Sequence, residues 1–336
     1  MKKLLYIGNR LSGKGKTVTT VDTLSLLLRN EGYEVFTASD KRNKVTRLLD
    51  MLIHIVKYTK QVEYVLIDTY STQNFYYAYL SGKLCCLLKL KYMPILHGGN
   101  LENRLANNPN MSRTLFFGAY KNVAPSQFTA SIFQKHGHSN LVCIPNTIEI
   151  KKYPFKARTF EEINLLWVRS FSEIYNPLLA IHLLKALKDE GVKASLCMVG
   201  PEGDGSLKQA KDLAEQLHVA VRFTGKLSKE EWVDLSKDYN IFINTTHFDN
   251  MPVSVIEAMA LGLPIVSTNV GGLPFLIDNG NEGVLVNPDD VKAFVSALKM
   301  LHNEPHKALD MATKARKKVE EFDWELVKEQ WKTLLG

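Results

Sequence analysis

The chain lacks the residues on which a disulfide or metal framework depends. Only four cysteines occur among 336 residues, and none of them belongs to a CxxC pair. This usage indicates neither a structural zinc nor a disulfide scaffold, and it is typical of a reducing cytosol. No Asp-x-Asp motif of the metal-chelating type occurs either. We therefore expect a protein that needs no metal and no cofactor.

Long apolar runs are also missing. The first residues, Met1-Lys2-Lys3, are followed only by the short run LLYIG, which is too brief for the apolar region of a signal peptide. No stretch of about 18 apolar residues occurs anywhere, so we expect no membrane-spanning helix. These absences predict a cytoplasmic protein.

The charge is unevenly distributed. At 336 residues two domains are expected, and 45% hydrophobic residues is ordinary for a folded protein. Residues 1–150 carry a net charge of +10 and the remainder −3. One domain is therefore expected to face something anionic, and a membrane surface, an acidic acceptor and nucleic acid all fit that description. No zinc finger, aromatic RNP motif or basic zipper is present, so we expect no nucleic-acid partner.

Strand-like and helix-like segments alternate twice along the chain, which predicts two parallel sheets covered by helices. Residues 145–160 are polar and contain prolines, as a connection between domains would. We expect a first Rossmann-like lobe at 1–150, a second at 151–320, and a last helix at 321–336 that packs back on the first lobe. The expected strands are 4–8, 33–37, 64–67, 93–96, 165–168, 196–200, 221–225, 241–245, 265–268 and 284–286.

A glycine-rich stretch, GNRLSGKGKT, follows the first expected strand. It fails the P-loop pattern because Gly13-Lys14 is followed by glycine, and it fails GxGxxG as well. One interpretation is a simple turn. The other is that Gly13 and Gly15 let backbone N–H groups approach a phosphate at the start of the next helix, as the carboxyl end of a strand favours.

The most informative segment runs from Ile241 to Pro274, IFINTTHFDNMPVSVIEAMALGLPIVSTNVGGLP. A buried strand leads to a polar loop, a helix that begins near Met251-Pro252, a second strand and Gly271-Gly272. This order is the half-unit of a nucleotide-binding sheet. Glu257 is suited to accept two hydrogen bonds from a ribose diol, although a solvated glutamate in a first helical turn is the simpler interpretation. Asp249 lies eight residues before it.

Two further residues follow expected strands. Arg169 comes after the strand NLLWV, where a guanidinium can bind a pyrophosphate at two points; an exposed loop arginine is the alternative. His97 comes after YMPIL and precedes two glycines. This setting makes a catalytic role about as well supported as a structural one. His136 and His138 lie in a polar loop and receive no role, and His247 is interpreted as a loop histidine.

These residues together resemble the donor-binding segment of the retaining glycosyltransferases of the GT4 family, which have the GT-B fold. The resemblance covers most of residues 90–335. Asp249 and Glu257 resemble the family's E-x7-E motif, with aspartate in the first place. The resemblance implies that Asp249 approaches the hydroxyls of the donor sugar and that Glu257 binds the ribose. It also implies that His97 lies near a hydroxyl of the transferred sugar.

The same resemblance implies contacts with the donor diphosphate. Gly13 and Gly15 would face it, and the backbone at Gly271-Gly272 would meet the diphosphate or the sugar. The family has a lysine five residues after the arginine, but Ile174 stands there. Lys226, Lys14 or Lys16 could supply the missing charge, and the sequence does not choose between them.

The basic first half contains an amphipathic stretch, residues 41–60, in which bases alternate with Leu48, Leu49, Leu52, Ile53 and Val56. An ordinary helix that faces the core explains this spacing. Docking on an anionic membrane surface explains it too, and would make the protein peripheral at the inner face of the membrane.

The expected function is that of a glycosyltransferase with two Rossmann-like lobes that face each other across a cleft. It would move a sugar from a nucleotide-diphosphate sugar to a hydroxyl acceptor, such as a glycan or a lipid-linked acceptor, in surface polysaccharide or glycolipid synthesis. Retention of the anomeric configuration is implied by the family alone. Two alternatives remain: a non-catalytic sugar-nucleotide-binding protein, and a GT-B relative that epimerises or phosphorolyses sugars.

Overall fold

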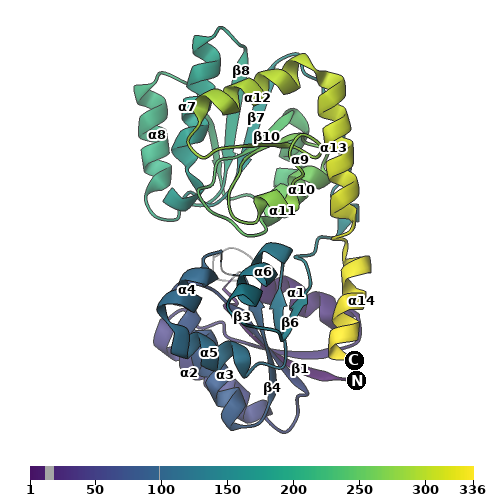
Figure 1. Ribbon diagram of the computed structural model, residues 1–336. Coiled ribbons are helices and arrows are strands. Elements are labelled where there is room, and N and C mark those ends of the chain that lie inside the picture. The colour runs from purple at the N-terminus through teal and green to yellow at the C-terminus, as the bar shows by residue number, and fades with distance from the viewer. Residues whose placement is uncertain (12–18, 98) are drawn as a thin grey trace. The chain divides into compact units, whose positions relative to one another are not determined.

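The computed structural model describes residues 1–11, 19–97 and 99–336 (Figure 1). The chain forms two compact units. The first comprises Met1–Pro145 together with Lys328–Gly336, and the second comprises Asn146–Val327. The sequence predicts a boundary after residue 150, whereas the units separate between Pro145 and Asn146, at the start of the polar connection.

The first unit is built on a six-stranded parallel sheet with the strand order β2-β1-β3-β4-β5-β6. Its first four strands were predicted from the sequence, whereas β5 and β6, with three residues each, were not. The strands are β1 Lys3–Ile7, β2 Glu34–Ala38, β3 Tyr64–Thr69, β4 Lys91–Leu96, β5 Asn122–Ala124 and β6 Leu141–Cys143.

Helices connect these strands, and their starts follow local capping rules. The Thr19 hydroxyl and the Asp22 carboxylate form a capping box at the start of α1, and the Ser126 hydroxyl accepts a hydrogen bond from the Thr129 N–H at the start of α6. The helix α1 therefore begins at Thr20. The helices are α1 Thr20–Asn30, α2 Lys44–Tyr58, α3 Phe75–Leu87, α4 Leu101–Asn107, α5 Pro109–Phe117 and α6 Gln127–Lys135.

The second unit holds another six-stranded parallel sheet, with the order β12-β11-β10-β7-β8-β9. All six strands were predicted, within two residues at either end. They are β7 Ile163–Val168, β8 Ala194–Val199, β9 Arg222–Gly225, β10 Ile241–Asn244, β11 Ile265–Thr268 and β12 Val284–Val286.

Both faces of this second sheet are buried, which explains why its strands are apolar without interruption. Successive side chains of a strand point to opposite faces. In β7, Leu165 and Trp167 pack in one core with α7 and α12, whereas Leu166 packs in the other core with α10. The helices of this unit are α7 Pro177–Asp189, α8 Ser206–Gln216, α9 Lys229–Leu235, α10 Val253–Ala260, α11 Leu273–Leu276, α12 Val291–Asn303 and α13 Pro305–Glu320, with short 3-10 turns η2 Ile150–Lys152, η3 Glu173–Tyr175 and η4 Ser236–Asp238.

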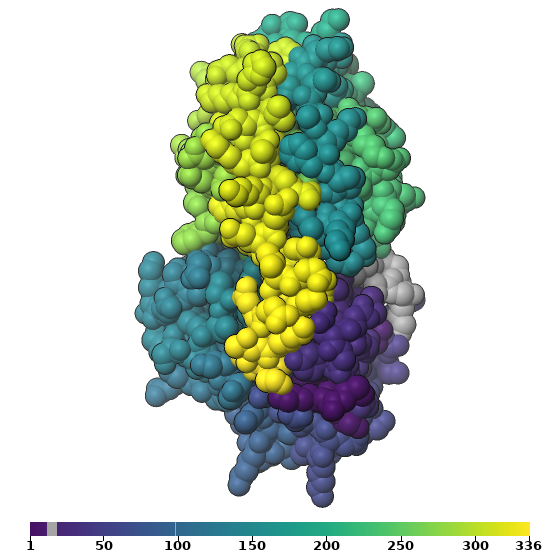
Figure 2. Space-filling view, turned by 90° about the vertical axis from the view of Figure 1, so that its right-hand side faces the viewer, coloured from purple at the N-terminus to yellow at the C-terminus, as the bar shows by residue number. Residues whose placement is uncertain are grey.

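The last helix, α14 (Trp324–Leu335), ends in the first unit. Glu31 at the end of α1 forms ion pairs with Lys328 and Lys332, and the Lys2 ammonium donates to the Leu335 carbonyl over 2.8 Å. Figure 2 shows the last residues of the chain, in yellow, beside the first residues, in purple. Among the described residues, no helix has both the length and the apolar character to span a membrane.

Each sheet has a switch point, at which the chain leaves one strand and builds the sheet in opposite directions. In the first unit this point lies between β1 and β3, and in the second it lies between β7 and β10. Ligands of open parallel sheets bind outside the carboxyl ends of strands at such points. The two switch points therefore mark where functional residues are expected.

Candidate functional site

Arg169 is the first residue after β7, at the switch point of the second sheet. Its guanidinium forms an ion pair with the Asp249 carboxylate and lies over the Tyr175 ring, 4.7 Å from the centroid. Gly200, at the end of β8, permits this arrangement, because a Cβ atom there would stand 1.6 Å from the Arg169 carbonyl oxygen. The arginine is thus held in place while its side chain keeps 12% exposure.

Asp249 lies in the loop that follows β10, the strand next to β7. The two residues that the sequence singled out separately are therefore direct partners. Gly271 and Gly272 pack against this loop: the Gly272 N–H donates to the Asp249 carbonyl over 2.9 Å. A Cβ atom at Gly272 would stand 1.8 Å from the Asn250 carbonyl oxygen. These glycines allow two backbone segments to meet, and Gly271 also takes a φ of +54°.

Glu257 lies on α10 and is 2% exposed, so the interpretation as a solvated glutamate is wrong. The Tyr153 hydroxyl donates to its Oε1 atom over 2.7 Å, and the Lys229 ammonium forms an ion pair with the same oxygen. Burial, with the Glu257 charge next, raises the pKa of Tyr153, which therefore stays a hydrogen-bond donor. A buried carboxylate held by these two donors is fixed in direction.

The position of the missing lysine, Ile174, is 44% exposed. Its carbonyl oxygen accepts hydrogen bonds from the His247 N–H over 2.8 Å and from the Thr246 hydroxyl over 3.1 Å, in the loop that leads to Asp249. The Asp204 carboxylate accepts hydrogen bonds from the Ser206 hydroxyl, the Ser172 hydroxyl and the Glu173 N–H, which in that order lower the pKa of Asp204 to about 2. The segment from Ser172 to Ile174, which follows Arg169, is thus held by hydrogen bonds at both ends.

Lys226 is exposed and directly follows β9, and Lys229 lies three residues further on, where it contacts Glu257. The other candidates for the missing charge, Lys14 and Lys16, lie outside the described residues, as do Gly13 and Gly15. Lys229 was not predicted from the sequence, in which it stands as an ordinary first residue of α9, between the Ser228 and Glu231 of a capping box. Tyr153 was also missed, because 104 residues separate it from Glu257.

His97 directly follows β4 in the first unit. Its Nε2 atom lies 2.8 Å from Oδ1 of Asp68, and its side chain is 8% exposed. Asp68 comes from the neighbouring strand β3, and its Oδ1 atom also accepts a hydrogen bond from the Tyr6 hydroxyl over 2.8 Å. His97 is therefore one member of a buried polar cluster that the sequence analysis did not predict.

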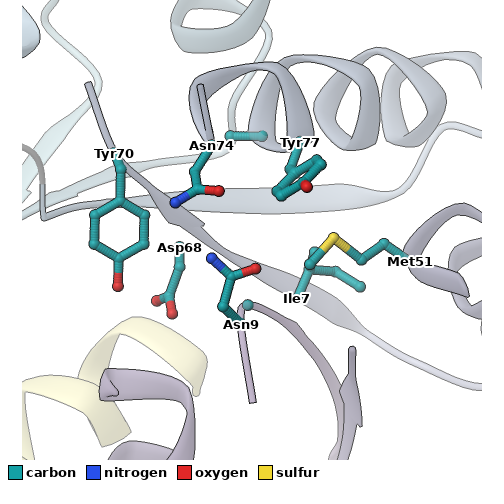
Figure 3. Close-up of a pocket in the computed structure, with 9 residues that line it drawn as sticks. Ile7, Asn9, Met51, Asp68, Tyr70, Asn74 and Tyr77 are labelled. Carbon is teal, nitrogen blue, oxygen red and sulfur yellow. The ribbon is translucent and has the colours of Figure 1, made fainter. Parts of the chain in front are cut away.

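A cavity of about 10 Å³, room for roughly one water molecule, opens beside this cluster. Figure 3 shows Asp68, Tyr70 and Asn9 around it, at the switch point between β1 and β3. The Asp68 Oδ2 atom is buried and has no hydrogen-bond partner among the described residues. Gly8 leaves room for this oxygen, because a Cβ atom at Gly8 would stand 2.5 Å from it.

The structure also shows the surroundings of two other histidines, His138 and His247. His138 is not a residue of an exposed polar loop, because it is 3% exposed and packs against the rings of Phe116, Phe117 and Phe133. His247 is a surface residue whose Nε2 atom lies 3.1 Å from Oδ1 of Asp289. Among residues 1–11, 19–97 and 99–336, no group of three or more His, Cys, Asp or Glu residues could hold a metal ion.

The fold is that of an α/β protein with two Rossmann-like sheets, and Arg169 and Asp249 meet at the switch point of the second one. The family model described as "Glycosyl transferases group 1" matches residues 150–318, the segment that contains Arg169, Asp249 and Glu257. The chain therefore belongs to the glycosyl transferases group 1 family, and the resemblance stated from the sequence is confirmed.

Curated relatives match part of the chain. A glycogen synthase of Mycobacterium tuberculosis is 27% identical over 197 residues, which cover 57% of this chain and 47% of that protein. The sulfoquinovosyl transferase SQD2 of Arabidopsis thaliana is 31% identical over 150 residues, which cover 43% of this chain and 28% of that protein. The matched part of the chain thus spans about half of the relatives' length or less.

Solved structures match nearly the whole chain. The sucrose-phosphate synthase of Thermosynechococcus elongatus superposes with a TM-score of 0.82 at 17% identity, covering 99% of this chain and 98% of that one. The HepE protein of Anabaena, solved in complex with UDP-glucose, gives 0.78 at 16% identity and covers 99% of both chains. These likenesses confirm the GT-B fold class predicted from the sequence.

Proposed function

We propose that this protein is a glycosyltransferase that moves a sugar from a nucleotide-diphosphate sugar to a hydroxyl acceptor. The observation that carries the proposal is the Arg169–Asp249 pair at the switch point of the second sheet, in the unit that also holds the buried Glu257. Family membership and the UDP-glucose bound by HepE support a nucleotide-sugar donor.

Each residue has a role in this proposal. Arg169 binds the donor diphosphate and neutralises it as it leaves, because a guanidinium offers paired N–H groups to phosphate oxygens. Asp249 binds hydroxyls of the donor sugar and also orients Arg169. Glu257 accepts hydrogen bonds from the ribose hydroxyls, and Lys229 and Tyr153 fix its carboxylate. Through the family resemblance we propose that His97, in the first unit, accepts a hydrogen bond from a sugar hydroxyl.

The mechanism proposed needs no metal ion, since Arg169 and backbone N–H groups stabilise the leaving diphosphate. Lys226 is a second candidate for diphosphate contact. Retention of the anomeric configuration is part of the proposal through the family resemblance. A product in the α configuration from an α-linked donor, observed by proton NMR, supports retention, and a β product contradicts it.

A panel of nucleotide sugars, screened by thermal shift and then by release of nucleoside diphosphate, tests the function. We expect one donor to raise the melting temperature and to release its nucleoside diphosphate when a hydroxyl acceptor is added. Binding without any turnover supports the non-catalytic sugar-nucleotide-binding protein instead. Free isomerised sugar or sugar phosphate supports the epimerase or phosphorylase alternative.

We further propose that the first unit docks on an anionic membrane surface, as a peripheral enzyme of surface polysaccharide or glycolipid synthesis would. The helix α2 faces the core with Met51 and Ile55, as an ordinary amphipathic helix does, but it also exposes a second apolar face. This face, the α2 stripe, consists of Val45, Leu49, Ile53 and Val56, which are 53–66% exposed.

The α2 stripe covers an arc of about 80° on the helix, given about 100° per residue. Exposed bases accompany it: Lys41, Arg42, Lys44, Lys57 and Lys60. An apolar face flanked by bases complements anionic lipid. Arg47 does not belong to this surface, because it is 7% exposed and donates to the carbonyl oxygens of Lys41 and Arg42.

Cosedimentation with phosphatidylglycerol vesicles at low salt tests the docking. Leu49→Ser with Ile53→Ser, or neutralisation of Lys41, Arg42, Lys44 and Lys57, should each reduce binding. The change Leu326→Ser removes an equally exposed leucine (57%) from the second unit and should not. Binding that is absent at low salt, or that the control variant weakens as much, contradicts the docking proposal.

A further inference from the structure

The first unit contains a buried carboxylate, Asp68, that has no role in the function proposed above. Asp68 is 5% exposed, lies one residue before the end of β3 at the switch point, and directs one oxygen toward two donors. These donors are the Tyr6 hydroxyl, from β1, and the His97 ring, from the residue after β4. A carboxylate taken out of water must be compensated by such contacts, so its position is tightly specified.

The hydrogen-bond donors and acceptors of this cluster determine which nitrogen of the neutral His97 ring carries the hydrogen. Burial, with the charge of Asp68 next, raises the pKa of Tyr6 well above its usual value, so its O–H hydrogen remains and is donated to Oδ1. An ionised carboxylate only accepts hydrogen bonds. The His97 Nε2 atom, 2.8 Å from the same oxygen, must therefore carry a hydrogen. In the neutral ring the other nitrogen, Nδ1, then has none and is an acceptor.

We infer that Asp68 is a positioning residue that holds His97 in its Nε2–H tautomer, so that Nδ1 is presented as the acceptor for a hydroxyl of a sugar ligand. This inference rests on the proposed function for the identity of that hydroxyl. No described residue forms a hydrogen bond with Nδ1. The Tyr70 ring lies 5.4 Å from the His97 ring and limits its rotation.

The consequence is a form of substrate selection. An acceptor nitrogen at this place favours the binding of a ligand that offers an O–H group. A ligand without that group leaves the nitrogen unpaired. The opposite tautomer would present an N–H group and would favour a ligand oxygen without a hydrogen. Asp68 therefore decides which of the two ligand chemistries the first unit accepts, although it touches no substrate itself.

Nitrogen NMR of protein labelled only at its histidines tests the tautomer without any substrate, at a pH where the imidazole is neutral. His97→Gln identifies the signals. We expect the wild-type His97 ring to be the Nε2–H tautomer alone. Asp68→Leu, which keeps the branching at Cγ but cannot accept a hydrogen bond, should yield a mixture, and so should the smaller Asp68→Ala. Tyr6→Phe is the matched control, because it removes the other donor to Oδ1 and should leave the tautomer unchanged.

A kinetic cycle separates positioning from a merely structural role. With UDP-glucose as the probe, Asp68→Leu and His97→Ala should each lower the turnover of nucleoside diphosphate release by roughly 10-fold, the effect of one hydrogen bond. The double variant should be no slower than either single one, since Asp68 acts only through His97. Asp50→Leu disturbs another Asp–His pair of the same unit, with His54, and should leave turnover unchanged.

The outcomes are distinguishable. A wild-type His97 with hydrogen on Nδ1, or a tautomer that Asp68→Leu leaves intact, overturns the inference whatever the activity. Additive losses in the double variant overturn it as well, because they indicate a structural effect. An Nε2–H tautomer that depends on Asp68, combined with full turnover in His97→Ala, upholds the assigned tautomer and removes His97 from the proposed function.

Discussion

Arg169 and Asp249, 80 residues apart in the sequence, form an ion pair at the carboxyl ends of the neighbouring strands β7 and β10. In the proposed function, Arg169 has two states: bound to Asp249, as in the structure, or shared with a donor phosphate. Because both side chains are largely buried, at 12% and 17% exposure, a phosphate that replaces or joins Asp249 meets an arginine that is already oriented.

Arg169→Ala should lower turnover on the order of 100-fold or more, as the loss of a preorganised charge contact does. Arg169→Lys should restore only part of the rate, because the paired N–H groups are lost. Steady-state release of nucleoside diphosphate measures both variants. An Arg169→Ala protein with full activity removes this residue from the mechanism.

Glu257→Gln should weaken the binding of nucleoside diphosphate by about 1.5–3 kcal/mol, the range for a charged hydrogen bond. Glutamine still accepts from Tyr153, so the fold should be retained. Calorimetric titration measures the change. The exposed Glu230→Gln is the control, because it removes the same charge from the neighbouring helix α9 and should leave affinity unaltered. Equal affinities for both variants and the wild type would falsify the ribose assignment.

Ile174→Lys should tighten diphosphate binding. The side chain is 44% exposed on the segment after Arg169, so a lysine fits without displacing the core. The added charge is expected to contribute up to about 1 kcal/mol at such an exposed site, with a decrease of the effect at high salt. Ile174→Gln controls for the change in size. If lysine and glutamine bind the diphosphate equally well, charge at this position has no role.

His138 should make the first unit less stable in mild acid. Burial lowers the pKa of His138 below its usual 6.5, and His136 adds a smaller effect. As the pH falls below 6.5 the unfolded chain therefore takes up the proton first, and stability is lost until the folded form also titrates. Urea denaturation at pH 7.5 and 5.5 measures this loss. His138→Phe should reduce the difference between the two pH values, whereas His136→Gln should leave most of it.

The fold was largely predictable because apolar strands and glycine turns follow local rules. The six strands of the second sheet were found in this way, and β5 and β6 were missed because three residues are too few to show a period. Arg169, Asp249 and Glu257 were found because they follow strands or resemble a motif. Their partners were not found: Tyr153 and Asp68 act through contacts with Glu257 and His97 over 104 and 29 residues, which no local pattern records.

The apolar residues of α2 show a different limit of prediction from the sequence. The sequence spacing was compatible with a core-facing helix and with a surface stripe, and the structure contains both faces on one helix. Arg47 is one of the bases of residues 41–60, but its buried guanidinium holds the loop before the helix. Periodicity identifies a face, and only packing against neighbours decides which residues of that face meet solvent.

The central claim is that the second unit binds a nucleotide-diphosphate sugar and transfers its sugar. Release of nucleoside diphosphate from a panel of nucleotide sugars, followed by phosphorus NMR in the presence of hydroxyl acceptors, tests it most directly. The account predicts release from at least one donor that depends on the acceptor and is reduced on the order of 100-fold in Arg169→Ala. Release that is equal in the wild type and in Arg169→Ala, or no release from any donor, would contradict it.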